Sequence, residues 1–353
     1  MRPLPLSRLL FSGESPNPKL VQRFAALNSG FCRKAVVALV GMCLTSPAYA
    51  QLTVDVDNAG TADLIIAVPA LPSPQNASTL AGTTEDLGNR ISDVIASDLD
   101  RSGLFKPIGR NAVKRITVDE VTAPTFPYWQ GRSASALIQG FVRSNGDGKI
   151  TVGCYLYDVA LGTELTRQGF VVEPADWRRA AHKCADTIYS RLSGESPFFD
   201  SRIAYIAETG PRDRRTRRLA IMDQDGENNR FLTDGQFQAL TPRWHPNATQ
   251  IAFMSYQRNE PRVYLFSLES GRQEVLGNFG GMTLSPRFSP DGRSVVLSAI
   301  RGGDANIFVV DLASRRERQL TNSPGLDVSP CFSPDGTQIV FNSDRGGDQT
   351  GVA

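Results

Sequence analysis

The C-terminal part of this chain is built from a repeated segment. The motif Ser-Pro-x-Phe-Ser-Pro-Asp-Gly begins at Ser285 and again at Ser329, and a related motif, Thr-Pro-Arg-Trp-His-Pro-Asn, begins at Thr241. The spacing is 44 residues both times, and a short apolar run follows each motif at an equivalent position. Several short strands per unit, repeated at this period, are typical of the blades of a β-propeller.

Turn chemistry accounts for the carboxylates that recur in these repeats. In Pro-Asp-Gly, proline presets φ, aspartate caps the turn and glycine adopts a positive φ. Asp223 and Asp311 likewise come at the ends of strand-like runs. The segment from Asp223 to Gly226 resembles half of a calcium-binding loop, but the rest of such a loop is missing from the sequence. We therefore predict no catalytic residues, no metal ligands and no cofactor.

Before the repeats, residues 61–198 predict a small α/β domain. Strand-like and helical patterns alternate there, and Asn-Gly and Asp-Gly between two strand-like runs indicate a β-hairpin. The expected elements are a strand at 64–68, a helix at 85–102, hairpin strands at 136–142 and 150–157, and a helix at 176–192. The expected fold class is an α/β N-terminal domain followed by an all-β propeller of four-stranded blades at 199–353.

A secretion signal is predicted at residues 1–50. The pair Arg33-Lys34 precedes an apolar run of ten residues from Ala35 to Leu44, and the small-residue motif Ala48-Tyr49-Ala50 follows. A positively charged segment, a short apolar core and an A-x-A motif, in that order, are the parts of a cleaved signal peptide. We expect the mature protein to begin at Gln51.

Removal of this signal changes the charge and the cysteine count. It leaves 32 basic and 35 acidic residues, so no basic excess indicates nucleic acid as a partner. Cys154, Cys184 and Cys331 remain, and one disulfide with a free thiol is possible in an oxidising compartment. We favour three buried free thiols. His182 lies beside the apolar stripe of the second expected helix, and we interpret it as structural.

Five features together resemble the TolB family, the periplasmic propeller proteins of the Tol-Pal system. They are the signal, the α/β domain, the Ser-Pro-Asp-Gly repeats, the segment from Asp176 to Lys183 (DWRRAAHK) and the segment from Phe199 to Tyr205 (FDSRIAY). The resemblance covers essentially all of residues 51–348. It implies a non-catalytic periplasmic scaffold that links TolA at the inner membrane to the peptidoglycan-associated lipoprotein Pal. Such a scaffold supports outer-membrane integrity and constriction during cell division, and other outer-membrane lipoproteins or porins are further candidate partners.

The resemblance also implies two binding regions. An N-terminal arm at residues 51–60 would bind TolA, and its alternating pattern suits strand addition to a partner's sheet; the alternative is that it pairs within its own domain. The candidate residues of the arm are Gln51, Leu52, Thr53, Val54, Asp55, Val56, Asp57 and Asn58. Pal would bind the loops that precede the first strand of each blade, because binding residues gather on loops of a rigid scaffold. The candidate loop residues are Phe237, Gln238, Gly281, Met282, Thr283, Ser285, Leu326, Asp327 and Val328.

The chain also departs from the family pattern. The family propeller has six blades, whereas residues 202–353 supply about three and a half repeats. Gly351 falls where Ile307 stands one repeat earlier, so the strand pattern fails there and we expect the chain to be cut, or frameshifted, part-way through a blade.

Two other functions remain open from the sequence. The first is the propeller of a periplasmic serine peptidase whose catalytic domain is missing, although no G-x-S-x-G motif occurs in this chain. The second is a propeller that binds a small molecule or a glycan, which would need several aromatic side chains at its mouth. Only Phe237 supplies one in the candidate loops.

Overall fold

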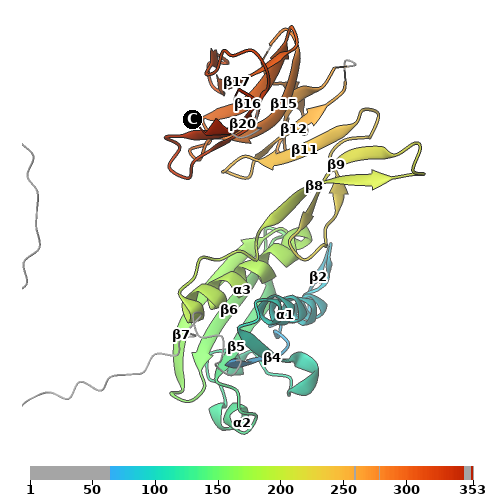
Figure 1. The fold of residues 1–353 in the computed structure, drawn as a ribbon. Helices are drawn as coiled ribbons and strands as arrows, with labels where there is room; N and C mark the ends of the chain where they lie inside the picture. Colours follow the sequence, from blue (N-terminus) through green and yellow to red (C-terminus); the bar gives the residue numbers. More distant parts are fainter. Residues whose placement is uncertain (1–63, 258–259, 278, 346–350, 353) are drawn as a thin grey trace, which may run out of the picture. The chain divides into compact units, whose positions relative to one another are not determined.

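The structure is a computed structural model, and it describes residues 64–257, 260–277, 279–345 and 351–352 (Figure 1). The expected signal at 1–50, its cleavage site and the arm at 51–60 lie outside the described residues. None of the helices within the described part has the length and apolar character needed to cross a membrane.

The first region of the fold is a five-stranded sheet in the order β4-β1-β5-β6-β7, with two long helices packed against it (Figure 1). Strand β1 runs parallel to β4 and β5, and the remaining neighbours are antiparallel. The strands are β1 (Leu64–Val68), β4 (Phe105–Gly109), β5 (Ala136–Ser144), β6 (Ile150–Asp158) and β7 (Thr163–Val172). The helices are α1 (Thr84–Arg101), α2 (Phe126–Gln130) and α3 (Trp177–Ser193). Short elements are β2 (Ser78–Thr79), β3 (Gly82–Thr83) and 3-10 turns at Arg110–Ala112, Asp119–Val121 and Pro174–Asp176.

Helix α1 forms where its capping and its apolar periodicity agree. The hydroxyl of Thr83 accepts a hydrogen bond from the backbone N–H of Asp86 at 3.1 Å, which caps the first turn. Apolar residues at helical spacing, from Leu87 to Leu99, are fully buried in the core between helices and sheet. A close approach occurs at Gly88, where an added Cβ would lie 2.0 Å from the carbonyl oxygen of Leu71. Position 88 therefore has no room for a side chain.

The two faces of the sheet bury different side chains. Ile66 and Ile138 belong to the core beneath α1 and α3, whereas their strand neighbours Ala67 and Leu137 belong to a second core that contains Trp129 of α2. This alternation follows from the two-residue period of a β-strand. The hairpin predicted at 136–157 and both predicted long helices are present.

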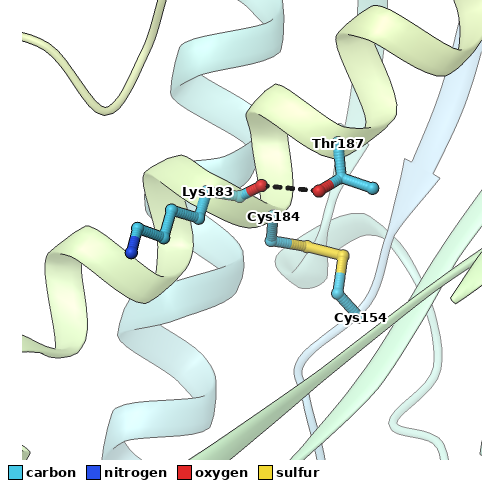
Figure 2. Close-up of a disulfide and its surroundings, with 4 residues drawn as sticks. All are labelled: Cys154, Lys183, Cys184 and Thr187. Atoms are coloured by element: carbon cyan, nitrogen blue, oxygen red, sulfur yellow. Dashed lines mark hydrogen bonds between the residues drawn. A yellow bond between two sulfur atoms is a disulfide. The ribbon is translucent and has the colours of Figure 1, made fainter. Parts of the chain in front are cut away.

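The expectation of three free thiols is wrong, because Cys154 and Cys184 form a disulfide. Figure 2 shows Cys184 on α3 and Cys154, of strand β6, joined through their sulfur atoms. Helix α3 packs over β6 and brings the two Cα atoms to 5.8 Å, although the residues are 30 positions apart in the chain. That separation is within the range that a disulfide spans. Cys331 is a free thiol and is half-buried.

The second region consists of four consecutive sheets. The first contains β8 (Arg202–Thr209), β9 (Thr216–Asp223) and β10 (Arg230–Phe231). The second contains β11 (Ala239–Trp244), β12 (Gln250–Ser255), β13 (Arg262–Ser267) and β14 (Gln273–Val275), and the third contains β15 (Met282–Phe288), β16 (Ser294–Arg301), β17 (Asp304–Asp311) and β18 (Glu317–Gln319). The fourth contains β19 (Asp327–Phe332), β20 (Ile339–Ser343) and β21 (Gly351–Val352). The 44-residue repeat is thus a repeat of antiparallel sheets, and the expected fold class is confirmed.

The fourth sheet contains a strand where the repeat pattern predicts none. The residues from Gly351 onward do not match the strand pattern of the preceding repeat, yet β21 begins at Gly351 and pairs with β20. Gly351 lies opposite Phe341, and Val352 lies opposite Val340. Strand pairing depends on backbone hydrogen bonds, which the side-chain pattern of two residues does not reveal.

Candidate interaction site

The three candidate segments begin just before equivalent strands and continue into them. The expectation that all of their residues lie in loops is therefore corrected, because Met282, Thr283, Ser285, Asp327 and Val328 belong to the strands, and Phe237, Gln238, Gly281 and Leu326 precede them. Strands β11, β15 and β19 each stand first in their sheet, and neighbouring members of this set contact one another. We call the segments 237–241, 281–285 and 325–329 the mouth loops. Three apolar side chains of these loops are exposed: Phe237 at 38%, Met282 at 36% and Leu326 at 46%. Met282 and Leu326 occupy the same repeat position, and Phe237 stands one position earlier in its repeat. Exposed apolar residues gathered at the starts of neighbouring blades are a feature of protein-binding surfaces.

Other predicted members of the mouth loops lie beneath the surface. Thr283 is buried, and its hydroxyl accepts a hydrogen bond from the backbone N–H of Val263 at 2.8 Å. Its own backbone N–H donates to the carbonyl of Pro261 at 2.9 Å. These contacts connect the third sheet to the second sheet. Thr283 therefore fixes the position of this mouth loop through buried contacts with the second sheet.

Asp327 is fully buried at the equivalent position of the fourth sheet. Its carboxylate accepts hydrogen bonds from the guanidinium of Arg345 and, at 3.1 Å, from the hydroxyl of Ser323. Burial opposes ionisation, but hydrogen bonds from Arg345, Ser343 and neighbouring hydroxyls outweigh it and lower the pKa of Asp327 to about 2. The side chain stays charged and holds the mouth loop against the end of β20.

The remaining candidates shape the backbone of the mouth loops. An added Cβ at Gly281 would lie 2.1 Å from the carbonyl oxygen of Ile300, so this loop packs directly on β16. Ser285 has a positive φ of 52° within a β-bulge. Gln238 is exposed and donates from its amide to the carbonyl of Arg215, whereas Val328 is half-buried. The candidates thus divide into exposed contact residues and residues that hold the loops.

Sequence reasoning missed the residues that anchor the third mouth loop. The backbone N–H of Leu326 donates to the carboxylate of Asp344 at 2.8 Å, and Arg345 binds Asp327 as described above. One signal was available, because Arg345 stands 44 residues after Arg301, whose guanidinium donates to the carbonyl of Phe279. An arginine repeated at the blade period indicates a repeated loop anchor.

A buried polar cluster lies between α1, α3 and the turn after β9. The Nδ1 atom of His182 is 2.6 Å from a carboxylate oxygen of Asp98, and its Nε2 atom is 3.8 Å from Asp225. Asp225 also binds the guanidinium of Arg178, and the amide of Gln224 donates to Asp98 at 2.9 Å. Asp98, His182 and Asp225 each offer an atom of a kind that binds metals. Arg178 already neutralises Asp225, and the cluster forms a polar contact between the α/β region and the first propeller sheet.

An α/β sheet region followed by repeated antiparallel sheets, with exposed loops before each first strand, defines a β-propeller protein that carries a separate N-terminal domain. Two family models match the chain: the TolB amino-terminal domain at residues 52–165 and the TolB beta propeller domain at residues 189–350. The chain therefore belongs to the TolB family.

Similar proteins agree with this assignment. The chain is 53% identical over 225 residues to the Tol-Pal system protein TolB of Zymomonas mobilis, which covers 64% of this chain and 49% of the relative. It is 55% identical over 227 residues to the protein of the same name from Rhizorhabdus wittichii, with 64% of this chain and 52% of the relative covered. The chain spans about half the length of these curated relatives.

A solved structure is also similar. The crystal structure of TolB from Acinetobacter baumannii matches with a TM-score of 0.66 and 29% sequence identity. The match covers 85% of this chain and 70% of that one. Both regions of the fold therefore have a counterpart in a single solved protein of the family.

Proposed function

We propose that this chain acts in the Tol-Pal system as a non-catalytic periplasmic scaffold that binds Pal through the mouth loops and TolA through the arm at 51–60. In this role it supports outer-membrane integrity and constriction during cell division. The proposal assigns residues 1–50 to a signal peptide, 61–198 to an α/β domain and 199–353 to a partial propeller.

The observation that carries this proposal is the recurrence of exposed apolar side chains on the mouth loops. Phe237, Met282 and Leu326 stand at the starts of three different sheets, and the buried contacts of Thr283 and Asp327 hold two of the mouth loops in place. A preordered surface loses little conformational entropy when it binds a partner. Several apolar contacts on a rigid frame therefore suit a protein partner.

The environment of the histidines supports a non-catalytic role. His182 is buried against Asp98, and the Nε2 atom of His245 lies 2.8 Å from the carbonyl oxygen of Gly292. The chain has two histidines, so both are engaged in contacts within the fold. A serine peptidase needs a histidine positioned beside its nucleophile, and no observation here favours that alternative.

Affinity capture from detergent-solubilised envelopes tests the proposal. The bait is the mature chain, beside a bait without residues 51–60 and a variant with F237A, M282A and L326A. We expect the shortened bait to lose TolA and keep Pal, and the triple variant to lose Pal and keep TolA. A variant with L80A and V171A is the matched control, because both residues are exposed and apolar but lie outside the mouth loops. Retention of neither partner by the folded, monomeric mature bait would refute the proposal.

A further inference from the structure

A cavity of about 290 Å³ lies between the first strands of the second, third and fourth sheets. Three of its lining residues occupy the same place in successive repeats, namely Arg243 on β11, Arg287 on β15 and Cys331 on β19. The following residue of each repeat, Trp244, Phe288 and Phe332, also lines the cavity. The cavity thus combines two guanidinium groups with three aromatic side chains.

A repeated backbone irregularity places these side chains. Each of the three strands contains a β-bulge, between Leu240 and Arg243, between Leu284 and Arg287, and between Val328 and Cys331. Within the bulges, Thr241, Ser285 and Ser329 have φ values of 48°, 52° and 57°. Residues other than glycine adopt such a φ at an energetic cost, and bulges commonly redirect a side chain toward a functional site. The same costly geometry therefore recurs three times next to one cavity.

No carboxylate of the described residues forms an ion pair with either arginine. Within the described part of the chain, neither guanidinium has a carboxylate within 4.0 Å, and no acidic residue lines the cavity. Arg178 and Arg262, which are well buried, both pair with carboxylates. Burial and the nearby charge of Arg287 lower the pKa of Arg243, and Cys331 acts in the opposite direction. Two like charges that are partly removed from water repel one another, and an anion between them relieves this repulsion.

We propose that this cavity is a binding site for the carboxylate of an organic acid or an acidic side chain, held by Arg243 and Arg287. Guanidinium groups bind carboxylates through paired N–H···O hydrogen bonds. The aromatic residues beside them suit the carbon skeleton to which the carboxylate is attached. This site is distinct from the mouth-loop surface and does not depend on the identity of its partner.

Cys331 provides a direct test, because its thiol lines the same cavity. Iodoacetate carries a carboxylate and iodoacetamide is its neutral analogue; each alkylates a thiolate with loss of iodide. We would measure both alkylation rates at Cys331 by mass spectrometry and divide the iodoacetate rate by the iodoacetamide rate. This ratio is then normalised by the same ratio measured for N-acetylcysteine. Because steering by fixed charges raises association rates by about 10-fold or more, we expect a normalised ratio of roughly 10 at low salt, falling as salt is added.

Variants of the two arginines test whether their charges cause the faster reaction with iodoacetate. R243Q and R287Q should each lower the normalised ratio, and the double variant should bring it to about 1. R272Q is the matched control, because Arg272 is an exposed arginine between β13 and β14 that does not line the cavity. The iodoacetamide rate reports folding, since an unfolded variant would react faster with the neutral reagent as well.

The result that overturns the proposal is a normalised ratio near 1 in the unaltered chain, or one that R243Q and R287Q leave unchanged. A Cys331 that reacts with neither reagent until the chain is denatured also overturns it, because the cavity is then closed to a small acid. A competition experiment tests whether the cavity prefers a carboxylate to a phosphate. Acetate should slow iodoacetate labelling more than inorganic phosphate does at equal concentration, and protection by phosphate alone would contradict the assignment to carboxylates.

Discussion

The imidazole of His182 and the carboxylate of Asp98 form a hydrogen bond of 2.6 Å, and both side chains are almost completely buried. The two residues lie on different helices, 84 positions apart. On its other side, His182 faces Asp225 in the turn after β9, and Asp223 and Arg178 complete the charged surroundings. A polar contact between the α/β sheet and the first propeller sheet is thus centred on one histidine.

Stability should depend on the protonation of His182. Burial lowers the pKa of this histidine, but the hydrogen bond and charge of Asp98, with the charges of Asp225 and Asp223, outweigh burial and raise the pKa above the ordinary 6.5. The contribution of protonated His182 to the free energy of unfolding is therefore fully present below pH 6.5. It is lost as the pH rises through the raised pKa of His182 in the folded protein. Urea unfolding at pH 6 and pH 9 should show lower stability at pH 9, and H182Q should reduce this difference. H245Q, at the other histidine, is the matched control.

Removal of the Asp98 carboxylate, the partner of His182, should lower the free energy of unfolding. D98N leaves a buried imidazolium without its carboxylate, and loss of one member of a buried ion pair costs about 3 kcal/mol. We expect a reduction of this size in the free energy of unfolding at pH 6, measured by urea titration. A difference between D98N and the unaltered chain that is as large at pH 9 as at pH 6 would contradict an ionic interaction.

The disulfide between Cys154 and Cys184 should stabilise the α/β region. A cross-link over 30 residues restricts the unfolded chain, and its removal costs about 3 kcal/mol. The double variant C154A/C184A should therefore unfold at lower urea concentration, and a reducing agent should have the same effect on the unaltered chain but none on the variant. C331A is the control, because Cys331 is a free thiol. Equal stability of the oxidised and reduced forms would refute this prediction.

Asp327 should contribute stability that disappears in acid. Its pKa is lowered from 3.8 to about 2, so the contribution is present above pH 4 and is lost as the pH falls through 2. One pKa unit corresponds to about 1.4 kcal/mol, so D327N should cost about 2 kcal/mol at pH 7. Thermal unfolding of D327N and R345Q at pH 7 checks this. D213N, at an exposed aspartate, should leave the unfolding temperature unchanged.

Replacement of Gly88 should destabilise the protein although it lies within a helix. Alanine normally favours a helix over glycine by about 1 kcal/mol. At this position, however, the added Cβ would meet the carbonyl oxygen of Leu71 at 2.0 Å, so α1 would have to move away from the loop after β1. We expect G88A to lower the midpoint of urea unfolding. G169A is the control, since nothing lies near a Cβ there, and a stability gain in G88A would contradict the close packing.

Several features could be predicted from the sequence because their causes are local. Asn-Gly and Asp-Gly specify the turn between β5 and β6, and the apolar spacing of α1 follows from the period of a helix. The sheets between Arg202 and Ser343 were predicted because the 44-residue spacing repeats the same turn chemistry. The exposed mouth-loop residues Met282 and Leu326 were identified by their register in these repeats.

Other features could not be predicted because they depend on packing between distant segments. The pairing of Cys154 with Cys184 depends on where α3 crosses β6, and the buried state of Asp327 depends on Arg345 at the end of the next strand. Strand β21 at Gly351 depends on backbone pairing with β20. In each case the residues alone are compatible with more than one arrangement.

The sequence by itself determined the repeated sheets and their turns, since each turn follows from side chains within a few residues of one another and the turns recur at a fixed spacing. Only the tertiary structure decided that Asp98 meets His182, that two cysteines are joined and that Arg243 and Arg287 line one cavity with no carboxylate among its described lining residues. The physical reason is that burial, charge and distance between groups remote in the chain are set by how the elements pack, and packing is a property of the whole fold.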